Sequence, residues 1–205
     1  METLNKKDVK VTTRIELKDL KIRVVKVAII GISPLLANKF SNKVKEEIAG
    51  KEQGKAKASK NEIRNPEKEY EEAKHISIEG WEGFPAGGIK KCLIRGAKAI
   101  GLVMTDVKAG VFVEPDCPET DLVRIIGESR FREDVGRNPS TGKGRIIYRA
   151  EFPVWEAILT ITFNEGLVSL DQVFQMIYAG GYGTGIGDWR PERGGNYGRF
   201  TLKDI

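Results

Sequence analysis

Residues 169–181 read Ser-Leu-Asp-Gln-Val-Phe-Gln-Met-Ile-Tyr-Ala-Gly-Gly and give the clearest helix signal in the chain. Ser169 can cap the helix N-terminus, and Gln172 three residues later completes a capping box. The apolar side of this helix is formed by Leu170, Val173, Phe174 and Ile177. We therefore predict a helix over 169–179 that packs on a sheet and is stopped by the glycine pair 180–181.

A second helix is predicted upstream, over residues 87–100. Its core-facing positions recur at helical spacing and are Ile89, Leu93, Ala97 and Ile100. Three cations, Lys91, Arg95 and Lys98, lie about 200° round the helix from that stripe. This helix is therefore expected to bury one side and present a basic side to solvent.

The remaining apolar segments have the length and β-branched content of strands. The predicted strands of the main sheet are 22–32, 110–114, 154–163 and 197–203. With the two helices they give the order β-α-β-β-α-β, an α+β ferredoxin-like (RRM-like) fold with an antiparallel sheet. The helices would cover one face and leave the other open. We expect one domain over 1–205, with a charged insertion at 39–74 (helical around 42–49 and 66–74) and a basic hairpin arm at 122–149.

Composition narrows the function. The chain has 205 residues, a formal net charge of +5, one histidine (His75) and two cysteines. A mildly basic balance weakly favours a polyanionic partner. A single histidine excludes acid–base pairs of two histidines and two-histidine metal sites within this chain. We expect no metal and no cofactor. The few cysteines, the polar N-terminus and the short apolar runs predict a cytoplasmic protein without a membrane segment.

A glycine-rich loop near the C-terminus is the most unusual feature. Its glycines include Gly185, Gly187, Gly194, Gly195 and Gly198, and they are interleaved with Trp189, Arg190, Arg193, Tyr197 and Arg199. Arginines pair with phosphates, aromatic rings stack on bases, and glycine lets backbone amides approach closely. The loop is therefore a candidate single-strand binding site. A tight loop packed on the sheet, with Trp189 as its plug, is the alternative interpretation.

The predicted arm carries a second group of cations. Its candidate nucleic-acid contacts are Arg130, Arg132, Arg137 and Lys143. A long basic hairpin can clamp a nucleic-acid strand through its phosphates. A solvated hairpin with no ligand is the alternative.

Three of these segments together resemble the RAMP superfamily, whose members form RNA-binding subunits of CRISPR effector complexes. They are the helix entry Phe84-Pro85-Ala86-Gly87-Gly88-Ile89-Lys90-Lys91, the helix 170–179 with its glycine pair, and the loop 185–200. The resemblance covers about half of the chain. It is greatest to the backbone subunits, which polymerise along a guide RNA.

The resemblance implies a non-catalytic binder of single-stranded nucleic acid, RNA before DNA, that forms homo-oligomers or joins a ribonucleoprotein complex. It also implies that Lys90, Lys91, Arg95 and Lys98 line the strand and that the arm acts as a thumb. The chain departs from members that cut target RNA with an aspartate, because it has no Asp from Leu20 through Thr105. A stand-alone or phage-borne relative fits equally well. The alternatives are a structural or interaction protein, such as a phage assembly component or a mimic of a CRISPR subunit, and an RNA endonuclease centred on His75 or Tyr197.

Overall fold

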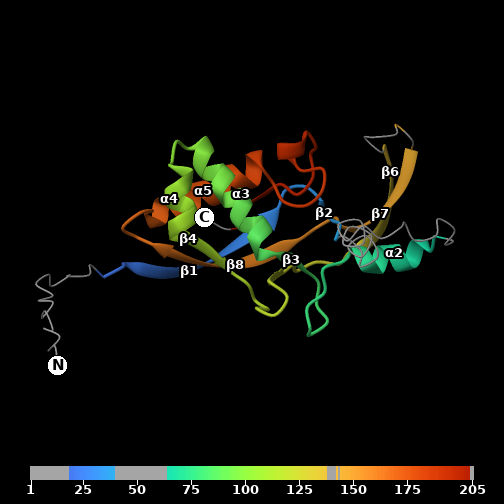
Figure 1. Ribbon diagram of the computed structural model, residues 1–205, viewed down its shortest axis with the longest axis horizontal. Coiled ribbons are helices and arrows are strands. Elements are labelled where there is room, and N and C mark those ends of the chain that lie inside the picture. Colours follow the sequence, from blue (N-terminus) through green and yellow to red (C-terminus); the bar gives the residue numbers. More distant parts are fainter. Residues whose placement is uncertain (1–18, 40–63, 138–141, 143, 204–205) are drawn as a thin grey trace, which may run out of the picture.

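The computed structural model describes residues 19–39, 64–137, 142 and 144–203, and it has the predicted α+β architecture (Figure 1). Its main antiparallel sheet has the strand order β4-β8-β1-β9. These strands are β1 (Ile22–Gly31), β4 (Val111–Glu114), β8 (Glu156–Asn164) and β9 (Phe200–Leu202). If these four strands are numbered 1 to 4 in chain order, they lie in the order 2-3-1-4. This is the 4-1-3-2 order of a ferredoxin-like unit, counted from the opposite edge. The predicted fold class is thus confirmed.

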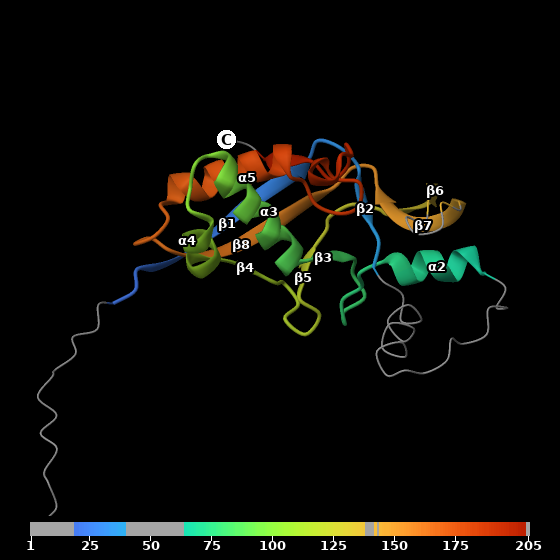
Figure 2. The ribbon, with the colours of Figure 1, turned by 45° about the horizontal axis from the view of Figure 1, so that its top comes forward.

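Two helices, α3 (Ala86–Ala99) and α5 (Leu170–Gly183), cover the same face of this sheet (Figures 1 and 2). The strands follow a period of two, so that one side of each strand is buried beneath the helices. In β8 the buried side consists of Ala157, Leu159, Ile161 and Phe163. The capping box of α5 forms as predicted between Ser169 and Gln172.

The glycine pair Gly180-Gly181 does not end α5, which continues to Gly183. That prediction was wrong because both glycines serve close packing. A Cβ at Gly180 would crowd the Cys92 carbonyl of α3, and one at Gly181 would overlap the Phe200 carbonyl of β9. Gly96 of α3 likewise approaches the backbone of α5 at Met176. The glycines therefore set the distance between the two helices and the sheet.

The basic arm is a β-hairpin made of β6 (Arg130–Arg137) and β7 (Gly144–Phe152). The hairpin arm predicted at 122–149 thus forms, with its strands over 130–137 and 144–152. β7 also pairs with β2 (Leu35–Ala37), which was not predicted. The arm projects beyond the main sheet, beside α2 (Pro66–Ala73) of the insertion (Figures 1 and 2). The predicted helix at 42–49 lies outside the described residues.

The remaining elements are short. β3 (Gly83–Pro85) leads directly into α3 and pairs with β5 (Leu122–Arg124), which follows β4, in a two-stranded sheet. α4 (Met104–Gly110) leads into β4. The strand predicted at 197–203 is shorter than expected, because β9 spans only Phe200–Leu202. No helix in the described part of the chain is long and apolar enough to cross a membrane.

Candidate nucleic-acid interface

The amphipathic character of α3 is as the sequence indicates. Ile89, Leu93 and Ala97 are fully buried, whereas Lys91, Arg95 and Lys98 are exposed. Lys90 differs from these three because its ammonium group is engaged within the protein: its Nζ donates to the Lys108 carbonyl at 3.1 Å. The same ammonium group sits 3.8 Å from the centroid of the Phe112 ring. Burial there lowers the pKa of Lys90.

The glycine-rich loop lies beyond the C-terminal end of α5 and returns to β9. It includes the short 3₁₀ helix η1 (Pro191–Arg193). Most of its amides already have acceptors within the protein: those of Gly185, Ile186, Asp188, Arg193, Gly194, Gly195, Tyr197 and Gly198. We expected the glycine amides to face phosphate oxygens, and for four of these glycines the structure corrects that expectation.

These glycines permit tight packing instead. Gly198 has φ +65° and donates to the Pro34 carbonyl at 2.7 Å, while its own carbonyl accepts from the Ile186 amide. A Cβ there would overlap the Ile186 carbonyl oxygen. Gly187, with φ +81°, is also too crowded for a side chain, because a Cβ there would lie 2.5 Å from the Leu36 carbonyl oxygen of β2. The alternative of a loop packed on the sheet thus describes its backbone correctly.

The arginines of this loop differ in how far their guanidinium groups are already bonded within the protein. Arg190 donates twice to Glu192, at 2.7 and 2.9 Å, and once to the Gly187 carbonyl at 3.0 Å. Arg193 is exposed, and within the described residues it forms no ion pair with a carboxylate. Arg199 is half-buried, and its guanidinium lies 5.9 Å from the Tyr182 ring centroid.

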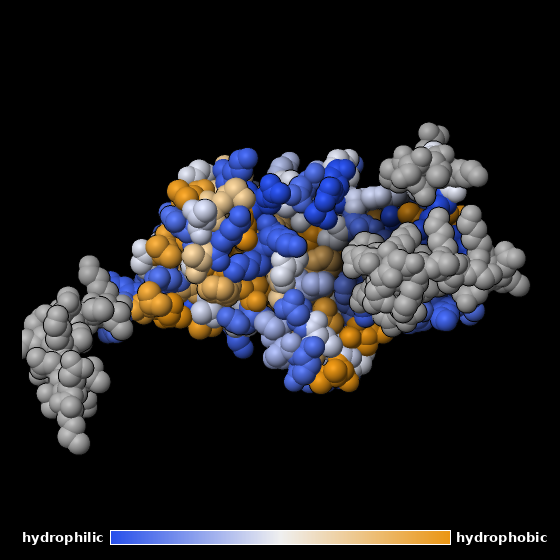
Figure 3. Space-filling view, viewed as in Figure 1, coloured by the Kyte–Doolittle hydropathy of each residue, from blue (hydrophilic) through white to orange (hydrophobic). Residues whose placement is uncertain are grey.

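One ion pair joins the loop to α3. The Arg95 Nε lies 3.1 Å from the Glu192 Oε1, so the exposed basic side of α3 and the exposed side of η1 meet. We call this the helix–loop surface. It consists of Lys91, Arg95, Lys98, Arg190, Glu192 and Arg193. Figure 3 shows hydrophilic side chains gathered over the glycine-rich loop, and hydrophilic side chains interspersed with apolar ones over α3.

The arm arginines are engaged in a network that ties the arm to the loop. Arg149, whose side chain is 4% exposed, donates to Asp134 of β6 and to Asp188 of the loop. Its guanidinium also lies 4.7 Å from the Trp189 ring centroid. Arg132 bonds Asp134, Glu151 and the Tyr197 hydroxyl. We call this group of side chains the arm–loop network.

This network changes the interpretation of several predicted contacts. Arg130 pairs with Glu151 at 2.7 Å, although its own side chain remains 65% exposed. Burial raises the pKa of Glu151, but hydrogen bonds from Arg130 and Arg132 outweigh burial and hold that pKa below its usual range. Trp189 keeps 37% of its surface exposed. The side chains of Arg137 and Lys143 lie outside the described residues.

Sequence reasoning missed the acidic half of this network. Three carboxylates determine which arginines are held in ion pairs within the protein. They are Asp134 of β6, Glu151 of β7 and Asp188 of the loop. The alternation of charge along β6 was the available signal, but the partners are far apart in sequence. Groups of three or more metal-ligating side chains are absent from the described part of the chain. Burial raises the pKa of Cys92 to about 12, so this thiol stays protonated in the α3–α5 contact.

The Glu192 carboxylate gives the helix–loop surface a pH dependence. The hydrogen bond from Arg190 lowers the pKa of Glu192, and the charges of Arg95 and Arg193 lower it further. A carboxyl whose folded pKa is depressed contributes stability above its unfolded pKa, about 4.3, and loses it as the pH falls through the folded value. We therefore expect Glu192→Gln to narrow the difference in melting temperature between pH 6 and pH 3. Exposed Glu128→Gln is the control, and equal narrowing in both variants would contradict the assignment.

Comparisons with known proteins give a distant structural likeness. No protein-family model and no curated protein matches the sequence. Among solved structures, the chain is similar to the crystal structure of Cmr6 from Pyrococcus furiosus, with a TM-score of 0.44 and 10% identity. The match covers 90% of this chain and 100% of that chain. At this distance the likeness assigns neither a family nor a function.

Proposed function

We propose that this protein binds single-stranded nucleic acid, RNA in preference to DNA, along the helix–loop surface, and that it does so without catalysing a reaction. In this proposal it is a subunit that assembles along the strand in a ribonucleoprotein complex. The preference for RNA rests on the sequence resemblance to the RAMP superfamily. The observation that carries the proposal is the Arg95–Glu192 contact, which brings two sequence-distant basic elements together.

The charge of this surface supports the proposal. It has five cations and one carboxylate, and that carboxylate accepts from Arg190 and pairs with Arg95. Lys91, Lys98 and Arg193 remain exposed and form no ion pair within the described residues. Cations held on rigid elements can follow a phosphate backbone, and they contact it without reading base identity.

The candidate catalytic groups have structural contacts that support a binding role. The Tyr197 hydroxyl accepts from Arg132 at 2.9 Å. The His75 ring packs edge-on against Phe84, with 6.1 Å between ring centroids. An endonuclease would need a base beside the attacking hydroxyl and a second group to protonate the leaving oxygen.

Salt-dependent binding tests this function. Three phosphate contacts on a single strand give a slope of about −2 in log affinity against log salt, which is about a 20-fold loss between 50 and 200 mM. We expect at least this loss for a labelled single-stranded RNA of about 20 nucleotides, measured by filter binding on nuclease-treated protein. Weaker binding to the matching duplex is expected as well. Absence of binding at 50 mM, or affinity that does not change with salt, would overturn the proposal.

A further inference from the structure

Strand β1 has an edge that its neighbour covers only in part. Along one side it pairs with β8 from Ile22 to Ile30, but on the other side β9 pairs only with Ile29–Gly31. Residues 22–27 therefore have no paired strand on that side in the part of the chain that the structure describes. Uncovered strand edges attract further strands, and most proteins shorten or block them.

The hydrogen-bonding groups at this edge can be identified. The Ala28 carbonyl accepts from the Lys203 amide on the β9 side, and the Gly31 amide donates to the Trp155 carbonyl on the β8 side. Backbone groups of successive residues point to alternate edges of a strand. Val24 and Lys26, like Ala28, therefore direct their N–H and C=O groups to the uncovered edge.

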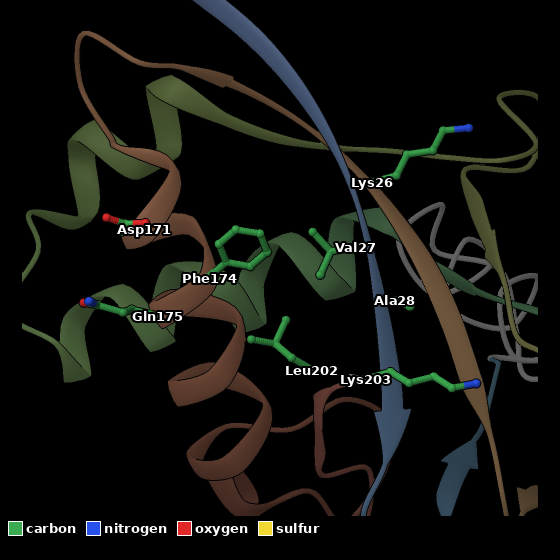
Figure 4. Close-up of a pocket in the computed structure, with 8 residues that line it drawn as sticks. All are labelled: Lys26, Val27, Ala28, Asp171, Phe174, Gln175, Leu202 and Lys203. Atoms are coloured by element: carbon green, nitrogen blue, oxygen red, sulfur yellow. The ribbon is translucent and has the colours of Figure 1, made fainter. Parts of the chain in front are cut away.

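An apolar groove runs beside this edge, between β1 and α5. It has a volume of about 560 Å³. In Figure 4, Val27, Phe174 and Leu202 converge in the groove, whereas the ammonium groups of Lys26 and Lys203 point away from it. An added strand would thus find main-chain partners along β1 and apolar contacts on the helix side. These two features together define a site for strand addition.

The N-terminal segment of the chain has the sequence such a site requires. Over residues 9–17 the odd positions are Val9, Val11, Thr13, Ile15 and Leu17, and the even positions are Lys10, Thr12, Arg14 and Glu16. This alternation of apolar or β-branched with polar residues is typical of a strand with one buried face. The odd side chains would enter the groove, and the even ones would face the open side of the sheet.

The direction of the chain favours delivery to a neighbour. Residues 19–21 continue outward from the end of β1 (Figure 1), and the Lys21 carbonyl accepts from the Glu165 amide at 2.8 Å. Pairing with the same molecule's β1 would need a reversal within these residues. We propose that the uncovered edge of β1 receives residues 9–17 of a second copy of this chain as an added strand. This contact joins two different surfaces of the chain, so each copy can both give and receive a strand, and copies can be linked into a row.

The test uses two full-length variants and light scattering after nuclease treatment, so that its outcome does not depend on nucleic-acid binding. Val24→Pro removes an edge-facing N–H, which leaves the β8 side of the ladder intact. The double variant Val11→Asp/Ile15→Asp replaces apolar side chains of the added strand. We expect assemblies of several chains for the unaltered protein and for the control Val24→Thr, which keeps the amide. Each blocked variant alone should be a monomer of about 22.8 kDa.

Mixing distinguishes this interface from others. The edge variant keeps an intact N-terminal segment and the segment variant keeps an intact edge, so equal amounts should form a species of two chains. A monomeric unaltered protein, assemblies that survive both blocks, or a mixture that stays monomeric would overturn the proposal. If Val24→Pro does not fold, the segment variant and inhibition of assembly by a synthetic peptide of residues 8–18 decide the question. Assemblies unaffected by both would equally overturn it.

Discussion

Replacing Gly198 by alanine is expected to lower the free energy of unfolding by about 3 kcal/mol or more, the range of severe single substitutions. Two costs add at this position. The positive φ of +65° disfavours any Cβ, and the added atom would overlap the carbonyl oxygen of Ile186. Backbone oxygen cannot move away here, because the Ile186 amide is itself bonded to the Gly198 carbonyl. Urea unfolding measures the loss, and nucleic-acid binding should fall with it.

Gly194 supplies a matched control for this change. It has a similar φ of +78°, but a Cβ there would meet no atom within 4 Å. Gly194→Ala should therefore cost only the conformational term of about 1–2 kcal/mol. Equal losses for the two variants would show that crowding at Gly198 contributes nothing, and the close packing of the loop would then not explain its glycines.

Replacing Asp134 by alanine is expected to destabilise the protein by about 3 kcal/mol, because it removes one partner of a buried ion pair. The Arg149 side chain is 4% exposed and that of Asp134 is 8% exposed, so water cannot easily replace the lost carboxylate. Arg149 keeps its contact with Asp188, which limits the loss. Chemical unfolding monitored by circular dichroism gives the value.

The exposed pair Arg23–Glu165 is the control for Asp134. Its side chains are 50% and 38% exposed, so Glu165→Ala should cost less than about 1 kcal/mol. If Asp134→Ala proved as mild as Glu165→Ala, the arm–loop network would not hold the arm in place. The arm would then be positioned by its pairing with β2 and its packing against α2.

The layered fold could be predicted because its signals are local. The apolar stripe of α3, the capping box at Ser169 and the β-branched run of β1 each act within one element, and their order along the chain gives the topology. The position of α3's basic side follows from the same periodicity. The sequence could not show which arginines form ion pairs with carboxylates, since Arg149 meets Asp134 and Asp188 only after folding.

Glycine was the residue most easily misread. Gly180 and Gly181 have the pattern of a helix stop, yet they continue α5 because α3 and β9 approach them too closely for a side chain. In the C-terminal loop, glycines that suggest open amides serve tight packing instead. The uncovered edge of β1 was equally invisible in the sequence, because it depends on how little of β9 pairs with β1.

The central claim is that nucleic acid follows the helix–loop surface. Two variants that lose the same number of charges, one on this surface and one elsewhere, test it most directly. The variant Lys91→Gln/Lys98→Gln/Arg193→Gln and the control Lys21→Gln/Lys26→Gln/Lys68→Gln each lower the formal net charge of +5 by three. The measurement is the salt slope of binding to single-stranded RNA. We predict that the first variant lowers the magnitude of the slope by about two units, while the control leaves it unchanged. Equal losses in both, or a loss confined to the control, would contradict the claim.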